Sequence, residues 1–327
     1  MRKNFLNRQN KISLILIIII ILLFLILAIL SPKLMNYGFF LELLKRSSEV
    51  IVLAVGTTIV FISGGFDLSF GSIMALSGAL TGIIYKIGIP FPLAFLIGIL
   101  ACIGIGLANG FFVVRVKLDP FIVTLAMAQI VRSIVYGITS GKTVTSFPDS
   151  FNNISEISIS KIPVIFIIAV FISIVANIFM RKTIVGRYLY AMGGNQLAAY
   201  CSGIYINKLK ILVYSLSGFL AGISGFLLAT RTNSVPPNTG LYTPLEVVTA
   251  VVVGGTLISG GDGSIFGSFL GVFTMILLVN VFNILGINPF WNLIVLGVIM
   301  IFVVSYESFS RIFSFRFNRL KIESNGK

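Results

Sequence analysis

Residues 181–210 read RKTIVGRYLYAMGGNQLAAYCSGIYINKLK, and they are the one substantial polar interruption between long apolar runs that also has the features of a folded segment. Asn195 is a favoured helix N-cap, residues 196–202 can form about two helical turns, and Gly203 suits the left-handed residue that follows a helix. Gly193 and Gly194 are expected to break the chain before this helix. We therefore predict a short capped helix outside the membrane; a basic loop with a chance helical turn is the alternative.

The flanks of this segment are basic. Arg181, Lys182 and Arg187 precede the short helix, and Lys208 and Lys210 follow it. An excess of Lys and Arg is typical of loops on the cytoplasmic side of a membrane. A short ordered helix presented to the cytoplasm between two membrane spans is a surface on which another protein can act.

The composition is that of a polytopic membrane protein. Hydrophobic residues make up 57% of the chain and charged residues 10%, against roughly 45–50% and 25% in soluble domains; the mean hydropathy is +1.06. The net charge of +14 comes from basic residues at the ends of apolar runs. It therefore favours membrane orientation over nucleic-acid binding, which needs a basic patch interleaved with aromatic residues.

Several kinds of chemistry are excluded by residue types that the sequence lacks. It contains no histidine, so Ser-His and Cys-His dyads and HExxH zinc sites are absent. Its two cysteines, Cys102 and Cys201, have neither metal-ligand nor CxxC spacing. There is no GxxxxGK[ST] phosphate-binding loop, so the chain does not itself draw energy from ATP. We expect no metal or cofactor to be bound by this chain itself.

The apolar runs predict an all-α polytopic membrane protein of about ten spans, some short or broken at glycines, in a single domain over residues 1–327. Ser31–Ser48 is expected to be a mixed, interfacial linker. Three of the runs, 49–62, 71–85 and 246–258, fall short of the roughly 20 residues of a straight span, so half-helices or continuation through glycines are expected there. The runs are 12–30, 49–62, 71–85, 91–114, 121–138, 162–180, 209–230, 246–258, 266–286 and 290–305.

The distribution of basic residues predicts the orientation. Ten spans place more than twice as many Lys and Arg residues on the side of the N-terminus and the short helix as on the other side. The membrane region is then 12–305, and the cytoplasmic parts are 1–11, the segment 181–210 and the basic tail 306–327. Residues 139–161 and the loop at Pro236 and Pro237 fall outside.

Two glycine-rich interruptions resemble each other, GGFDLSFGS at 64–72 and GGDGSIFGS at 260–268. Glycine lets the backbone leave a helix, and Asp or Ser can cap the helix that resumes. Broken helices are where transporters place their pathway, but a tight cytoplasmic turn is the simpler interpretation. Both interpretations stay open for Asp67, and the turn is favoured for Asp262. The pathway candidates of the first segment are Gly64, Gly65, Asp67 and Ser69.

Polar residues inside predicted spans should face the protein interior, because hydrocarbon offers them no partner. They either hold helices together, which is the commoner role, or line a polar path. Small residues also recur at helical spacing over 217–225, which is typical of close helix packing. The polar residues are Asn109, Gln129, Arg132, Asn280 and Asn283, and the three asparagines are further pathway candidates.

Three segments resemble the membrane permease of ribose-type (monosaccharide) ABC importers, in the larger group that includes branched-chain amino acid permeases. The GGFDLS segment leans toward the sugar type. Phe66 and Phe70 stand where smaller aliphatic residues are common, which leaves the detail of packing open. The segments follow the family's order and spacing over about 50–304, and they are GGFDLSFGS (64–72), GRYLYAMGGNQLAAYCSGI (186–204) and VVVGGTLISGGDGSIFGSFLG (251–271).

The resemblance implies a bacterial inner-membrane permease that works as a dimer with a second copy or a homologue. It receives sugar from a periplasmic or lipoprotein binding protein and is driven by a cytoplasmic ATPase, which holds the ATP and Mg. Neutral sugars fit the expected near absence of buried acid–base pairs, with recognition through hydrogen bonds. The family's ATPase-docking loop corresponds here to Gly193, Gly194, Asn195, Ala198, Ala199, Ser202, Gly203 and Ile204.

Other functions remain as alternatives. The same type of importer could carry nucleosides or another small solute. An ion-coupled secondary transporter would use Arg132 with Asp67 and need no ATPase. An intramembrane protease would pair Asp67 with Asp262, although Ser259 stands where its GxGD pattern has glycine. A passive anchor or receptor would have little use for two glycine-broken segments.

Overall fold

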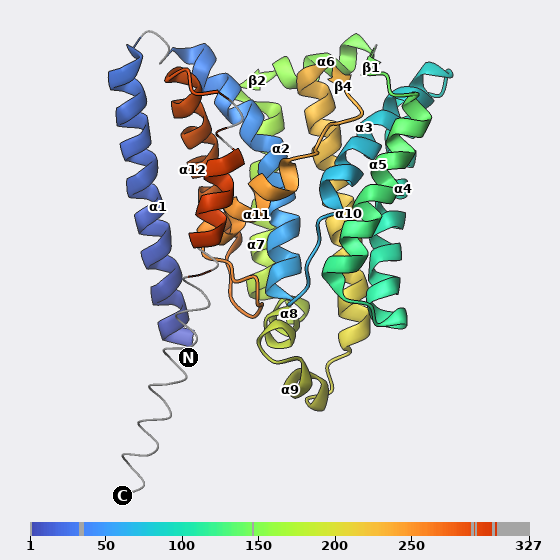
Figure 1. Ribbon diagram of the computed structural model, residues 1–327, viewed down its shortest axis with the longest axis vertical. Helices are drawn as coiled ribbons and strands as arrows, with labels where there is room; N and C mark the ends of the chain where they lie inside the picture. Colours follow the sequence, from blue (N-terminus) through green and yellow to red (C-terminus); the bar gives the residue numbers. More distant parts are fainter. Residues whose placement is uncertain are drawn as a thin grey trace, which may run out of the picture.

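The protein is a bundle of long helices that run roughly parallel or antiparallel to one another (Figure 1). A computed structural model describes residues 2–32, 36–145, 147–288, 291, 293–302 and 305. Two pairs of two-residue antiparallel strands accompany the helices: β1 (Val144–Thr145) with β4 (Ser234–Val235), and β2 (Ser158–Ile159) with β3 (Ile162–Pro163). The helices are α1 (Arg2–Leu30), α2 (Tyr37–Ile62), α3 (Phe70–Lys86), α4 (Phe91–Phe111), the π-helical turn η2 (Phe112–Val116), α5 (Pro120–Thr139), α6 (Asp149–Glu156), α7 (Val164–Lys182), α8 (Ile184–Gly194), α9 (Gln196–Cys201), α10 (Ile206–Thr232), α11 (Thr243–Val253) and α12 (Ile265–Ile284).

The helices are those of a polytopic membrane protein. Three apolar helices are shorter than a span, namely Phe70–Lys86, Thr243–Val253 and Leu293–Phe302. The predicted count of about ten spans stays a prediction. Within the described part of the chain, six helices are long and apolar enough to cross a membrane: Arg8–Leu30, Phe91–Val116, Pro120–Thr139, Val164–Lys182, Ile206–Thr232 and Ile265–Ile284.

The two ends of the bundle differ. Helices α8 and α9 project from one end, which we call the α9 face, and α6 with the strand pair β1–β4 lies at the opposite end, the α6 face (Figure 1). The N-terminal end of α1 and the turn η2 also lie at the α9 face. Arg115 of η2 and the basic flanks of α9 therefore share one face with the N-terminus, as the distribution of basic residues predicted. The tail 306–327 lies outside the described residues.

Helix α2 is one continuous helix of 26 residues. The prediction of an interfacial linker up to residue 48 was therefore wrong, and of the two alternatives left open for 49–62 the half-helix is excluded. Asn36 caps the first turn by accepting a hydrogen bond from the Phe39 N–H. Two charged residues of the expected linker lie inside the helix with partners, Glu42 paired with Arg231 and Arg46 paired with Glu246. A hydropathy scale scores each charged residue without its partner, so a helix that contains paired charges looks less apolar than it is.

Two extended segments enter the bundle from opposite ends. Segment 63–69 leaves α2 at the α9 face and reaches the start of α3 at mid-height, and segment 233–242 leaves α10 at the α6 face and reaches the start of α11 (Figure 1). The second segment meets the first turn of α3, which follows the first segment, because a Cβ on Gly71 would lie 2.4 Å from the Gly240 carbonyl oxygen. Such backbone contact requires glycine. Pro236 and Pro237, predicted in an outer loop, thus belong to a re-entrant segment.

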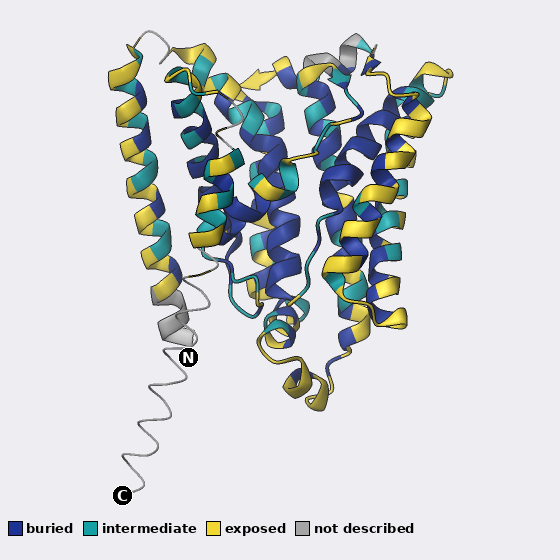
Figure 2. Ribbon diagram, in the orientation of Figure 1, coloured by how far each residue is buried: buried dark blue, intermediate teal, exposed yellow. Residues whose placement is uncertain are grey.

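Helix α10 is the centre of the bundle and packs against α2, α3 and α4. A Cβ on Gly218 would lie 2.3 Å from the Cys102 carbonyl oxygen, and a Cβ on Gly225 would lie 2.1 Å from that of Met74. The prediction of close packing at this small-residue face is confirmed. Figure 2 shows α2 and α10 largely buried, while α1 and α5 carry exposed faces.

Candidate functional site

Segment 183–205 folds into two helices at the α9 face. Helix α8 begins after Thr183, whose hydroxyl accepts a hydrogen bond from the Gly186 N–H. Helix α9 begins after Asn195, whose side chain accepts from the Ala198 N–H at 2.9 Å, and it is followed by Gly203 with φ of 81°. The capped helix was predicted, but α8 was not. The two glycines, 193 and 194, end α8 instead of breaking the chain, because the break comes at Asn195.

Helix α9 presents large apolar side chains to the outside. Leu197 is 73% exposed, Tyr200 69% and Tyr205 76%, whereas Ala199 is buried. Ser202 donates a hydrogen bond to the Ala198 carbonyl oxygen and so helps to close the helix. Exposed apolar patches are common at protein–protein contacts. Of the predicted coupling residues in and around this helix, Ala199 and Ile204 are buried, whereas Asn195, Ala198, Ser202 and Gly203 are exposed. Their role in coupling stays a prediction.

The end of α8 touches both glycine-rich interruptions. A Cβ on Gly193 would lie 1.9 Å from the Ile62 carbonyl oxygen and 2.6 Å from the Gly261 nitrogen, and a Cβ on Gly260 would lie 2.8 Å from the Gly64 Cα. The Gly261 N–H donates to the Ile62 carbonyl at 2.9 Å. Three chain segments therefore meet backbone to backbone, which glycine alone permits. We call this contact the glycine junction, and it consists of Gly64, Gly193, Gly194, Gly260 and Gly261.

Asp67 lies in the first re-entrant segment and is 1% exposed. Its carboxylate accepts hydrogen bonds from the Ser69 N–H at 2.8 Å, the Ser69 hydroxyl at 2.6 Å and the Ser217 hydroxyl of α10 at 2.7 Å. The Asn109 amide of α4 donates to the Ser69 hydroxyl at 2.9 Å. Three predicted pathway residues, Asp67, Ser69 and Asn109, thus form one buried network that ties the re-entrant segment to α4 and α10. Gly64 and Gly65 precede this network, where Gly64 has a φ of 75°.

We expect Asp67→Ala to lower the free energy of unfolding by about 3 kcal/mol, because it leaves buried donors of Ser69 and Ser217 without an acceptor. Asp67→Asn, which keeps an acceptor oxygen, should cost less. The matched control is Asp119→Ala, which removes an exposed cap of α5 and should cost only about 1 kcal/mol. Thermal unfolding of the detergent-solubilised protein measures the difference, and equal losses for Asp67→Ala and Asp119→Ala would contradict the network.

Arg132 of α5 holds the second re-entrant segment. It is 7% exposed and donates to the carbonyl oxygens of Pro237 at 2.7 Å and Thr239 at 2.5 Å. Its guanidinium group therefore donates hydrogen bonds to backbone carbonyls of segment 233–242, while the Asp67 carboxylate accepts hydrogen bonds from serine side chains. The pairing of Arg132 with Asp67 that an ion-coupled transporter would need is not formed.

Asp262 lies in the turn between α11 and α12. Its carboxylate accepts from Arg8 at 2.7 Å and from Gln9 at 3.2 Å, so the turn is fastened to α1. Burial raises the pKa of the Asp262 carboxyl, and Arg8 opposes this shift. Burial also raises the pKa of Tyr190 to about 12, so this α8 side chain stays protonated and donates to the Gly263 carbonyl at 2.9 Å. Asp262 thus behaves as a turn residue, with partners different from those of Asp67, whereas an aspartyl dyad would share one proton.

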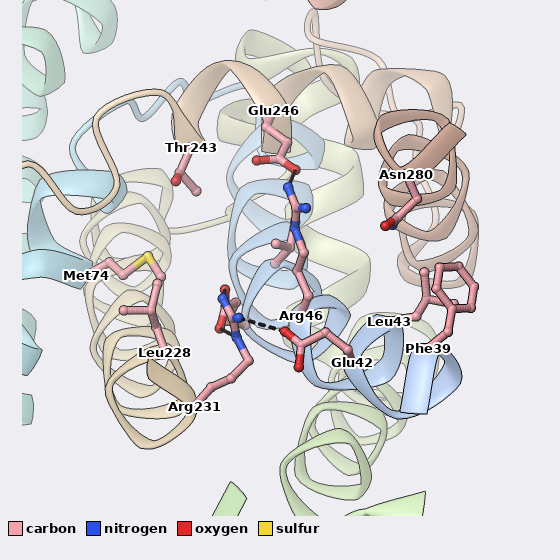
Figure 3. Close-up of a pocket in the computed structure, with 12 residues that line it drawn as sticks. Phe39, Glu42, Leu43, Arg46, Met74, Leu228, Arg231, Thr243, Glu246 and Asn280 are labelled. Carbon is pink, nitrogen blue, oxygen red and sulfur yellow. Dashed lines mark hydrogen bonds and ion pairs between the residues drawn. The ribbon is translucent and has the colours of Figure 1, made fainter. Parts of the chain in front are cut away.

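Two polar residues that were predicted to face the interior are exposed, namely Gln129 and Asn283. Helical spacing puts Gln129 opposite the buried stripe of α5, and Asn283 lies in the last turn of α12. Asn280 is half-buried and faces a cavity (Figure 3). Of the residues predicted in α12, only Asn280 thus lies where a polar path could run.

A polar cavity of about 380 Å³ lies between α2, α10, α11 and α12 (Figure 3). Its residue Arg231 belongs to the last turn of α10, which ends at the α6 face (Figure 1). Arg231 binds Glu49 through hydrogen bonds of 2.8 and 3.1 Å and Glu42 through one of 3.1 Å. Glu49 is 5% exposed, so the expectation that buried acid–base pairs are nearly absent was wrong. Sequence reasoning missed this site because Glu49 begins an apolar run and Arg231 ends one. The charged residues that line the cavity are Glu42, Arg46, Glu49, Arg231 and Glu246.

Together these features define the class of protein. Re-entrant segments that meet at mid-bundle, short helices that start there, and a polar cavity among apolar helices are typical of membrane transport proteins with broken helices. A family model described as "Branched-chain amino acid transport system / permease component" matches residues 39–304, and the chain belongs to this family of membrane permeases.

Individual relatives agree with this assignment. The ribose import permease protein RbsC of Bacillus subtilis is 34% identical over 279 residues, which cover 85% of this chain and 87% of that one. RbsC of Haemophilus influenzae is 33% identical over 290 residues, with 86% and 88% covered. The fructose import permease protein FrcC of Rhizobium meliloti is 31% identical over 282 residues, with 82% and 77% covered. No solved structure matches the chain. The resemblance seen in the three sequence segments is confirmed, and the chain is a transport subunit rather than an enzyme.

Proposed function

We propose that the chain is the membrane-spanning permease subunit of an ATP-driven, binding-protein-dependent importer of a monosaccharide such as ribose. The observation that carries the proposal is the exposed helix α9, which is joined through α8 to the glycine junction and so to both glycine-rich segments. The similarity to ribose and fructose import permeases supports a sugar as the substrate. Nucleosides and other small neutral solutes are the alternative substrates.

The α9 face is the cytoplasmic side of the bacterial inner membrane in this proposal. The basic residues of α1, η2 and the α8–α9 segment support this orientation. The ATPase then docks on α9 and holds the ATP and Mg, and the solute-binding protein delivers sugar at the α6 face. A second permease, a copy or a homologue, completes the transporter. The part played by this chain is to convert movement at α9 into a change of access.

The bundle offers a direct mechanical route for this movement. Helix α10 begins at Ile206, shortly after α9, and its last turn carries Arg231 of the polar cavity. Its 27 residues span about 40 Å. A displacement of α9 therefore acts on α10 directly, and on α2 and the turn before α12 through the glycine junction. Because packed interfaces switch between discrete arrangements, a small shift at α9 can change which face the cavity opens to.

Reconstitution tests this function. The permease is placed in liposomes with its partner ATPase and solute-binding protein, and uptake of radiolabelled ribose is measured. We expect uptake that needs ATP and both partners, and competition by nucleosides would identify the alternative substrates. Uptake that persists without the ATPase and stops when an ion gradient is collapsed would establish a secondary transporter instead.

A further inference from the structure

The polar cavity holds more hydrogen-bonding capacity than its own residues use. Arg231, Glu49 and Glu42 satisfy one another. Arg46 and Glu246 form an ion pair, but their closest nitrogen–oxygen distance of 3.9 Å is beyond a hydrogen bond. Glu246 Oε1 is buried and has no hydrogen-bond partner among the residues that the structure describes. One guanidinium and one carboxylate thus face the cavity with spare donors and acceptors.

Further polar groups converge on the same space. The Asn280 amide nitrogen donates to the Ile276 carbonyl oxygen at 2.8 Å, which leaves the amide oxygen of Asn280 as an acceptor. Thr243 adds a hydroxyl at the start of the short helix α11. Figure 3 shows Arg46, Glu246 and Asn280 around one opening, with side chains from α2, α11 and α12.

A purely structural ion cluster would not look like this. A buried carboxylate oxygen without a partner costs about 1–3 kcal/mol or more, and closing the gap between Arg46 and Glu246 would remove that cost. The cavity volume of about 380 Å³ is instead within the range of small-molecule sites, about 300–1,000 Å³. An unfilled acceptor beside an unfilled donor, in a space of that size, is the arrangement expected of a site awaiting a ligand that both donates and accepts.

We propose that this cavity binds the substrate during import, as a neutral polyhydroxy compound whose neighbouring hydroxyls bridge Arg46 and Glu246. The proposal rests on the proposed function and specifies where the permease itself recognises its cargo. Two arginines and three glutamates line the cavity, so its surplus charge is negative and disfavours anions. A free monosaccharide is therefore accepted and a sugar phosphate is rejected.

Cysteine protection tests the site without the ATPase. Thr243→Cys is introduced with Cys201→Ser, since Cys201 is exposed and Cys102 is buried. The rate of maleimide labelling of the purified permease is measured with ribose and with ribose 5-phosphate, each at millimolar concentration. We expect ribose to slow labelling by about twofold when half of the sites are occupied, and ribose 5-phosphate to have no effect.

Matched variants separate binding from structure. Adding Glu246→Gln or Arg46→Gln should abolish the protection, because a hydrogen bond to a charged group contributes about tenfold or more in affinity. Asp119→Asn should keep it, because that exposed side chain caps α5 and does not line the cavity. Three results would overturn the proposal. Protection could survive Glu246→Gln, ribose 5-phosphate could protect as well as ribose, or no neutral sugar that the reconstituted transporter imports could protect the cysteine. A transporter that imports no monosaccharide would instead overturn the proposed function. In that case, protection by a neutral nucleoside or polyol would still support the cavity as a binding site, and no protection by either would overturn it.

Discussion

Gly193→Ala should abolish ATP-driven uptake by the reconstituted transporter and lower the free energy of unfolding by about 3 kcal/mol. The added methyl group would lie 1.9 Å from the Ile62 carbonyl oxygen and 2.6 Å from the Gly261 nitrogen. Both are backbone atoms, so no side-chain rotation relieves the clash. Helix α8 must then move away from α2 and from the turn before α12, which breaks the route from α9 into the bundle. Uptake rate and thermal midpoint are the two measurements.

The neighbouring glycine provides the control for this variant. Gly194 contributes only backbone atoms to the junction, because a Cβ on it would meet nothing within 4 Å. Gly194→Ala should therefore keep both uptake and stability. The two variants make the same substitution at adjacent positions of α8, and they differ only in whether the added methyl group meets the backbone of another segment. If Gly193→Ala and Gly194→Ala behave alike, the glycine junction does not have the role given to it here.

Ala198→Pro should reduce uptake by about tenfold or more while the bundle stays folded. The Ala198 N–H donates to the Asn195 side chain, and proline removes that donor from the first turn of α9. Because α9 projects from the bundle, the damage should stay local. Gln196→Pro is the matched control, since proline is well tolerated at the first position of a helix. Uptake that survives Ala198→Pro would remove the main support for coupling through α9.

Local signals in the sequence were sufficient for the short elements. Asn195 and Gly203 defined α9 because capping depends on residues within one turn of the helix end. The glycines of α10 predicted close packing because their spacing places them on one face of the helix. The family followed from motifs that are contiguous in the chain.

Features built from distant residues could not be predicted in this way. The length of α2 and the polar cavity depend on the pairing of Glu49 with Arg231, which lie 182 positions apart. The glycine junction joins residues near 64, 193 and 260, and each glycine pair alone indicates only a turn. The re-entrant course of segment 233–242 depends on Arg132 of another helix. In each case the partner, and not the local pattern, decides the structure.

Helix α9 carries its own probe for the central claim, that force enters the permease through this helix from the cytoplasm. Cys201 is exposed and Cys102 is buried, so a membrane-impermeant maleimide reports on α9 alone. We expect labelling of Cys201 in inside-out vesicles and none in right-side-out vesicles, with labelling blocked when the ATPase is bound. Labelling from the outer side, or labelling that the bound ATPase leaves unchanged, would contradict the account.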